Sequence, residues 1–219
     1  MKRISPVMIR RIFMSIAGVT VMGASVGLFS LAKLGMDPFQ VFAHGIWRHS
    51  GMSFGSCYTV LSIVMLVIVF FLDRHKIGLG TLLNVLFVGY IADGVEGLLG
   101  GVLGEMSLAG RIVLLLVALV ILCFASSLYM TADLGVSVYD ALALSASEKI
   151  PARFALCRII SDLLCVGIGM LLCYLYDHDP GAGGALWTTA GAGTIITAFF
   201  MGPVISFFNK TVSQPLLNQ

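Results

Sequence analysis

Two ionisable residues lie four positions apart in an apolar segment of the second half of the chain. Arg158 and Asp162 are spaced i, i+4, so a helix places them on one face, where opposite charges neutralise each other. Charged side chains in such surroundings are costly and need a partner or a function. We expect either a structural ion pair or a pair that binds substrate and takes part in gating.

A second group of polar residues follows two Leu-Gly pairs. After Leu34-Gly35, Asp37 and Pro38 are typical of a helix start, because the aspartate caps free N–H groups and proline is tolerated in the first turn. Gln40 lies in that turn. After Leu134-Gly135, Ser137 and Asp140 have the spacing of a capping box.

These starts predict short helices over about 39–48 and 138–148, too short to cross a bilayer. Their N-terminal ends carry partial positive charge and suit an anionic or zwitterionic group, if the helices enter the membrane. If both lie flat on the membrane surfaces, they are ordinary capped helices. The sequence leaves both readings open.

Three further polar residues are candidates for contact with a solute or proton. Asp93, with Glu96 one turn away, lies near one end of an apolar segment, where solvation also explains it. Asn84 suits a hydrogen bond between packed helices. His44 lies seven residues after Asp37, on the same helical face, and suits a proton relay or a solvated or capped histidine.

The elements that position these residues are membrane-spanning helices. Of the 219 residues, 58 % are hydrophobic and 11 % charged, against about 25 % charged in soluble domains. The apolar segments do not alternate as β-barrel strands do. Six of them are long enough to span: 12–32, 50–72, 77–97, 112–132, 159–176 and 180–209.

The distribution of basic residues predicts that both termini are cytoplasmic in a multi-pass protein of the cell membrane. Cytoplasmic loops are rich in Lys and Arg. With the N-terminus inside, ten of the thirteen basic residues face the cytoplasm: Lys2, Arg3, Arg10, Arg11, Arg74, Lys76, Lys149, Arg153, Arg158 and Lys210. The others, Lys33, Arg48 and Arg111, lie outside.

The sequence contains an internal repeat. Matching residues lie 100 positions apart over most of each half and 113 positions apart near its end. Leu34-Gly35 falls on Leu134-Gly135, and Gly80-Thr81 falls on Gly193-Thr194. We therefore expect a single all-α membrane domain over 1–219, with one repeat at about 11–99 and another at about 111–209. Three spans per repeat invert the second half, as in many secondary transporters.

These motifs carry a family resemblance. The Ala-x-Leu-Gly breaks at 32–35 and 132–135, the short segments after them, and Gly-x-Gly-Thr at 78–81 and 191–194 resemble the YczE/YyaS/YitT family of bacterial membrane proteins. The resemblance extends over about 13–208. It implies a multi-span, transporter-like protein and supplies no catalytic template.

The leading hypothesis is a secondary permease for a small polar, zwitterionic or anionic solute. The candidate binding residues are Asp37, Gln40, His44, Asn84, Asp93, Asp140, Arg158 and Asp162. The rival is a substrate-binding or accessory subunit that works with a separate partner. We expect no catalytic residues, metal, cofactor or nucleic acid; the expected partners are the lipid bilayer and a solute, with a homo-oligomer left open.

Overall fold

The chain folds as an assembly of helices in a computed structural model, which describes residues 5–104, 106–149, 154–177 and 188–218. No strand occurs in these ranges. The elements are α1 (Pro6–Ala32), α2 (Pro38–Ser50), α3 (Phe54–Asp73), η1 (Arg74–Lys76), α4 (Leu79–Leu103), α5 (Leu108–Ala132), α6 (Val138–Lys149), α7 (Phe154–Asp177), α9 (Ala192–Phe208), η2 (Asn209–Ser213) and α10 (Gln214–Asn218).

Six helical segments are long and apolar enough to cross a membrane, as the sequence predicts. They are α1, α3 with η1, α4, α5, α7 and the path from α9 into α10. Large apolar side chains face outward along them; Phe71 on α3 is 81 % exposed and Phe199 on α9 is 74 % exposed. Such an outer surface suits lipid as the surrounding solvent.

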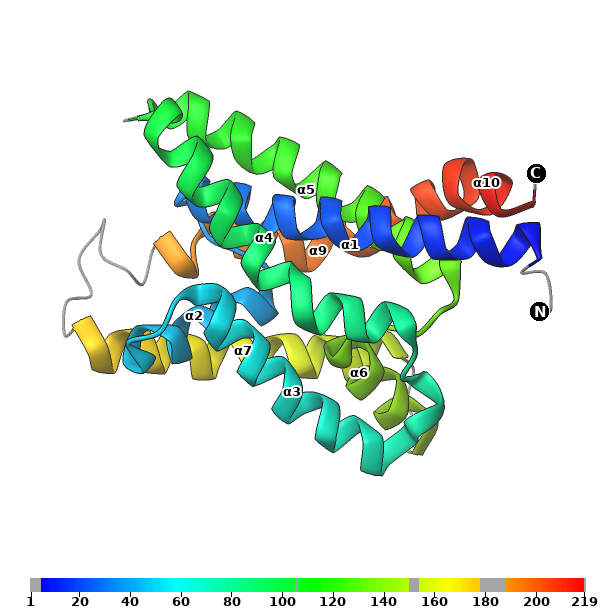
Figure 1. Cartoon of the computed structure of the whole chain (residues 1–219). Helices are drawn as coiled ribbons and strands as arrows, with labels where there is room; N and C mark the ends of the chain where they lie inside the picture. Colours follow the sequence, from blue (N-terminus) through cyan, green and yellow to red (C-terminus); the bar gives the residue numbers. More distant parts are fainter. Residues whose placement is uncertain (1–4, 105, 150–153, 178–187, 219) are drawn as a thin grey trace.

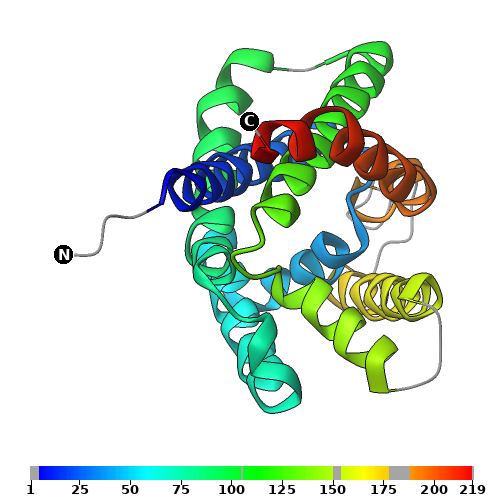
Figure 2. The ribbon, with the colours of Figure 1, turned by 90° about the vertical axis from the view of Figure 1, so that its right-hand side faces the viewer.

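The short helices α2 and α6 begin close to their predicted positions and lie between the long helices, not on the outside of the bundle (Figure 1). Helix α2 packs against α7 and α3, and α6 packs against α3 and α7. Seen from the end where both termini lie, the long helices surround the start of α2 (Figure 2). The N-terminal ends of α2 and α6 therefore meet inside the bundle.

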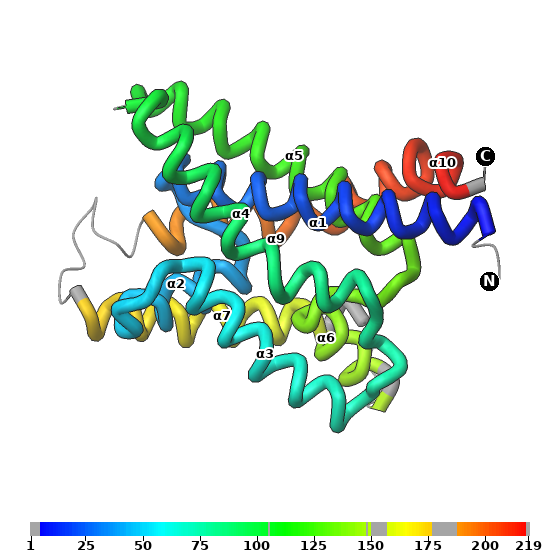
Figure 3. The backbone as a smooth tube through the Cα atoms, viewed as in Figure 1, coloured from blue at the N-terminus to red at the C-terminus, as the bar shows by residue number. Residues whose placement is uncertain are grey.

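The chain turns back into the bundle at the two Leu-Gly breaks, which can be followed along the tube in Figure 3. Gly35 and Gly135 have φ of +105° and +104°, a conformation that favours glycine. A Cβ atom on either would lie 2.5 Å from a backbone nitrogen, that of Gly191 or Gly78 respectively. Glycine is required at both positions by conformation and by space.

Each break is held by the start of a long helix from the other half. The N–H of Gly193 donates to the carbonyl of Leu34 over 2.7 Å, and the N–H of Gly80 donates to the carbonyl of Leu134 over 2.8 Å. Leu34 corresponds to Leu134, and Gly80 to Gly193, at the offsets seen in the sequence. These matching bonds support two related halves; their inverted relation stays a prediction.

One pair of corresponding interfaces differs between the halves. Helices α3 and α4 pack closely where Gly89 meets Gly55: a Cβ on Gly89 would lie 2.9 Å from the Gly55 Cα. The corresponding helices α7 and α9 make at most marginal contact among the described residues. Gly202, the counterpart of Gly89, has open space where its Cβ would stand.

The last span departs from the expectation in its bounds. Helix α9 begins at Ala192, and the expected start at Pro180 lies outside the described residues, as do Lys2, Arg3 and Arg153. Beyond the expected end at Asn209, the chain continues through the π-helical turn η2 into α10. The Asn209 side-chain oxygen accepts a hydrogen bond from Ser127 on α5 over 2.8 Å. The cytoplasmic side of the termini stays a prediction.

Candidate functional site

A cavity of about 60 Å³ lies where α2 and α6 begin, enough room for several water molecules or a small solute. Twelve of its lining residues form six pairs whose members are 100 positions apart. The pairs are Met22 with Leu122, Val26 with Ser126, Asp37 with Ser137, Phe39 with Tyr139, Gln40 with Asp140, and Tyr58 with Arg158. Asn84, Val138 and Met201 complete the lining. The cavity thus lies between the two predicted repeats.

Arg158 is the centre of an ion-pair network on one wall. Its Nη1 contacts Asp140, and its Nε donates to Asp162 over 3.2 Å. Asp162 also accepts a hydrogen bond from the hydroxyl of Tyr139. The guanidinium lies 4.4 Å from the centre of the Tyr139 ring, a cation–π distance. The predicted i, i+4 pair is therefore present, but Arg158 holds a second carboxylate on α6.

Asp140 is fixed from two sides. Its other carboxylate oxygen accepts from the Ser137 hydroxyl over 2.7 Å, and its backbone N–H donates to the same hydroxyl over 3.1 Å. Ser137 therefore caps α6 as predicted. The Asp140 carboxylate meets the Ser137 hydroxyl, whereas in a capping box it would accept from the backbone N–H.

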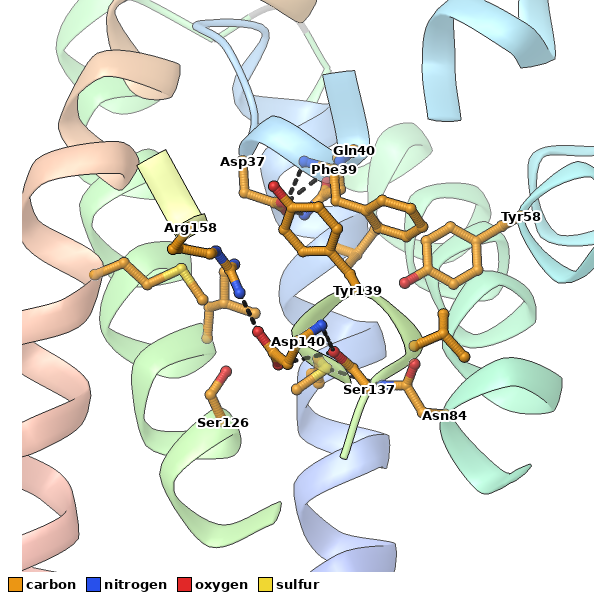
Figure 4. A pocket seen from close by; sticks show the side chains of 15 residues that line it. Asp37, Phe39, Gln40, Tyr58, Asn84, Ser126, Ser137, Tyr139, Asp140 and Arg158 are labelled. Atoms are coloured by element: carbon orange, nitrogen blue, oxygen red, sulfur yellow. Dashed lines mark hydrogen bonds and ion pairs between the residues drawn. The ribbon is translucent and has the colours of Figure 1, made fainter. Parts of the chain in front are cut away.

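Asp37 lies at the start of α2. One of its oxygens accepts from the backbone N–H groups of Phe39 and Gln40, over 3.1 and 3.2 Å. The other accepts from the Gln40 side chain. Figure 4 shows these three residues on the wall facing Asp140 and Ser137. A carboxylate at each helix start is favoured by the partial positive charge there.

Aromatic rings connect the two helix starts. Phe39 stacks on Tyr139, with ring centres 5.2 Å apart and planes 22° apart, and meets the Tyr58 ring edge-on at 5.4 Å. Phe39 and Tyr139 occupy corresponding positions, so the stack joins the halves. Offset stacked and edge-to-face pairs are preferred ring geometries. This contact fixes the separation of α2 and α6.

Two hydroxyl groups in the cavity have no hydrogen-bond partner among the described residues. Tyr58 and Ser126 are 6 % and 5 % exposed, and Figure 4 shows their hydroxyls directed into the cavity. Asn84, 2 % exposed, donates only to the sulfur of Met22, at 3.3 Å. Buried polar groups nearly always have partners. These three offer free hydrogen-bonding capacity to an occupant.

Two of the predicted residues lie elsewhere. His44 stacks on Phe54, with ring centres 4.4 Å apart, and does not line the cavity. Asp93 accepts from the backbone N–H of Gly55 over 2.7 Å, where it ties α4 to the start of α3. Asp37, Gln40, Asn84, Asp140 and Arg158 line the cavity, and Asp162 supports it through Arg158 and Tyr139.

The sequence reading did not select Phe39, Tyr58, Ser126 or Tyr139. Aromatic and serine residues within apolar helices normally pack against neighbouring helices, so their residue types did not indicate a binding site. A signal was present in the repeat: Phe39 and Tyr58 correspond to Tyr139 and Arg158 at the same offset as the two breaks. Comparing the two halves position by position would have selected them.

Comparison with known proteins identifies relatives over nearly the whole chain. A family described as a family of unknown function, DUF6198, matches residues 9–210. An uncharacterized protein of Haemophilus influenzae is 25 % identical over 197 residues, 90 % of this chain and 82 % of that protein. The uncharacterized membrane protein YczE of Bacillus subtilis is 24 % identical over 192 residues, 87 % of this chain and 81 % of that one. No solved structure matches.

Proposed function

We propose that this chain, which belongs to the family of unknown function DUF6198, is a secondary transporter for a small polar solute. The YczE resemblance predicted from the sequence is confirmed. One observation carries the proposal: the cavity is lined by six pairs of residues 100 positions apart, at the meeting point of two short helices, and it includes charged and hydroxyl side chains.

The position of the cavity suits transport more than structural packing. In transporters built from repeats, the solute binds where discontinuous helices meet near the middle of the membrane. Helices α2 and α6 meet at their N-terminal ends, and three polar side chains in the cavity retain free hydrogen-bonding capacity. The proposed partners are the lipid bilayer and the solute, with no covalent step.

The unequal helix interfaces provide a route for alternating access. In the present state α3 is closed against α4, while α7 and α9 are scarcely in contact among the described residues. In a second state with the arrangements exchanged, α7 would pack against α9 and the bundle would open between α3 and α4. Rocking of one half against the other around a fixed site is the usual form of such a cycle.

A melting screen followed by uptake tests the proposal. Purified protein is melted in the presence of a broad panel of small polar metabolites, and each stabilising solute is then measured for uptake into proteoliposomes. A solute at about 100 times its Kd raises the free energy of unfolding by about 2.7 kcal/mol. We expect saturable uptake that is lost in the double variant Asp140→Asn/Arg158→Gln.

The matched control is Asp133→Asn. Asp133 forms an ion pair with Arg11 at 3.2 Å, and its side chain is 80 % exposed, away from the cavity. This variant should keep full uptake. A panel without any stabilising solute contradicts the proposal. Binding without uptake, together with co-purification of an ATPase, favours a substrate-binding subunit instead.

A further inference from the structure

The cavity wall carries more negative than positive charge. Asp37 and Asp140 line the cavity, and Asp162 lies directly behind Arg158. Arg158 is the one basic residue in the described lining. The two helix N-termini add about half a positive charge each. Together with the guanidinium they offset about two of the three carboxylates, so about one negative charge is left uncompensated.

The helix N-termini do not supply an anion site, because the protein's own side chains already occupy them. Asp37 accepts both free N–H groups that it reaches on α2, and the Ser137 hydroxyl caps α6. Arg158 is likewise engaged by two carboxylates. An incoming anion would have to displace these contacts and would meet an excess of negative charge.

The unpartnered groups and the aromatic wall suit a cation that also carries a polar group. The hydroxyls of Tyr58 and Ser126 point into the cavity without a protein partner (Figure 4). The rings of Phe39 and Tyr58 stand on the same wall as Asp37. Aromatic faces attract ammonium groups, and a hydroxyl can accept from an ammonium or donate to a solute oxygen.

Given that the protein transports a solute through this cavity, we infer that the solute carries a single positive charge on an amine. The ammonium lies between the carboxylates of Asp37 and Asp140, beside the Phe39 and Tyr58 rings. A hydroxyl or other small polar group of the solute meets Ser126 and Asn84. The cavity volume of about 60 Å³ favours a solute of few heavy atoms.

Four probes of similar size separate this charge preference from others. Ethanolamine is a cation, 1-propanol replaces its ammonium by a methyl group, propionate is an anion, and glycine is a zwitterion. Binding of each to the purified protein at pH 7 is measured by calorimetry and by melting. We expect ethanolamine to bind and to raise the melting temperature, with 1-propanol and propionate at least about tenfold weaker, since hydrogen bonds to charged groups contribute strongly.

Three variants test how the solute is held. Asp37→Asn removes the negative charge but keeps a good helix cap, so we expect a folded protein with ethanolamine affinity lowered at least about tenfold. Asp133→Asn removes an exposed carboxylate outside the cavity and should leave affinity unchanged. Ser126→Ala should weaken ethanolamine binding but leave binding of methylammonium, which lacks the hydroxyl, unchanged.

The outcomes distinguish this inference from the transport proposal. Binding of propionate or 1-propanol as tight as that of ethanolamine overturns the charge assignment and leaves transport standing. The same holds if Asp37→Asn binds ethanolamine as the parent does, or if none of the probes binds while neutral or anionic metabolites stabilise the protein. If no solute in the broad panel binds, the transport proposal itself fails.

Discussion

Arg158 illustrates how much a single side chain can hold together in an apolar bundle. It contacts carboxylates on two helices and covers the ring of Tyr139. The side chains of Arg158, Asp140 and Asp162 are 23 %, 20 % and 15 % exposed. Removing one member of such a network leaves the others as uncompensated charges in a poorly solvated place.

We expect Arg158→Gln to lower the free energy of unfolding by about 3 kcal/mol, as for other broken buried pairs. Arg158→Lys should recover part of this loss, because an ammonium keeps the charge but lacks the planar fork that holds two carboxylates. The measurement is denaturant unfolding in detergent micelles. In the double variant Arg158→Gln/Asp140→Asn the loss should be smaller than in Arg158→Gln alone, since one stranded charge is removed.

Residue types and local spacing revealed only the contacts made within one helix or one turn. The spacing of Arg158 and Asp162 and the cap at Ser137 could be predicted because both lie within four residues. The contact between Arg158 and Asp140 joins residues of two different helices, so no local pattern indicates it. The position of His44 away from the cavity could not be predicted, because a helical face shared with Asp37 does not determine which helices cover that face.

At the scale of elements, the two breaks after α1 and α5 determine where the short helices begin. Their glycines combine a positive φ with close approach to another backbone, so each position depends on conformation and space together. A substitution at either break should therefore move the start of α2 or α6 and distort the cavity.

We expect Gly35→Ala and Gly135→Ala each to lower the free energy of unfolding by more than about 1 kcal/mol, the usual cost of a strained backbone conformation, and to weaken solute binding. Gly51→Ala is the matched control: Gly51 has φ of +66° but open space around its Cβ position. It should show the conformational cost without the loss of binding. Equal effects in all three variants would mean that close packing at the breaks is unimportant.

Elements were more predictable than contacts, because run length and helix starts are local properties. The first five spans, the two short helices and both breaks lie close to their predicted places, and a sixth span is present with different bounds. Whether α2 and α6 enter the bundle was left open, since a capped start looks the same on a membrane surface and between helices. The π-helical turn η2 was not predicted; it depends on Asn209 meeting Ser127 and Thr131 of α5, far away in sequence.

At the scale of the whole molecule, the two predicted repeats differ where α3 meets α4 and α7 meets α9. The sequence of α9 suits a movable element. It contains Gly202 followed by Pro203, and a proline within a helix removes a backbone hydrogen bond and favours a bend. The corresponding part of α4 has Gly89 and Tyr90, without a proline.

We expect a stabilising solute to shift the distance between α7 and α9 in one direction and that between α3 and α4 in the other. Spin labels at Leu171→Cys and Phe199→Cys report the first interface, and their counterparts Phe71→Cys and Leu86→Cys report the second. All four positions are exposed. Pulsed electron resonance measures both distances in lipid. Solute-independent distances at both interfaces would contradict alternating access.

The exchange of hydrogen bonds between the halves has a consequence for how the protein is made. The N–H of Met36 donates to the carbonyl of Thr189, which is synthesised 153 residues later, whereas the N–H of Val136 donates to Lys76, which is synthesised 60 residues earlier. During synthesis, Lys76, the partner of the second break, is made before that break. Thr189, the partner of the first break, is made only shortly before the last span. Nascent chains that stop before Thr189 therefore lack the partner of the Met36 N–H, and insertion of the final helix is the step that completes the cavity.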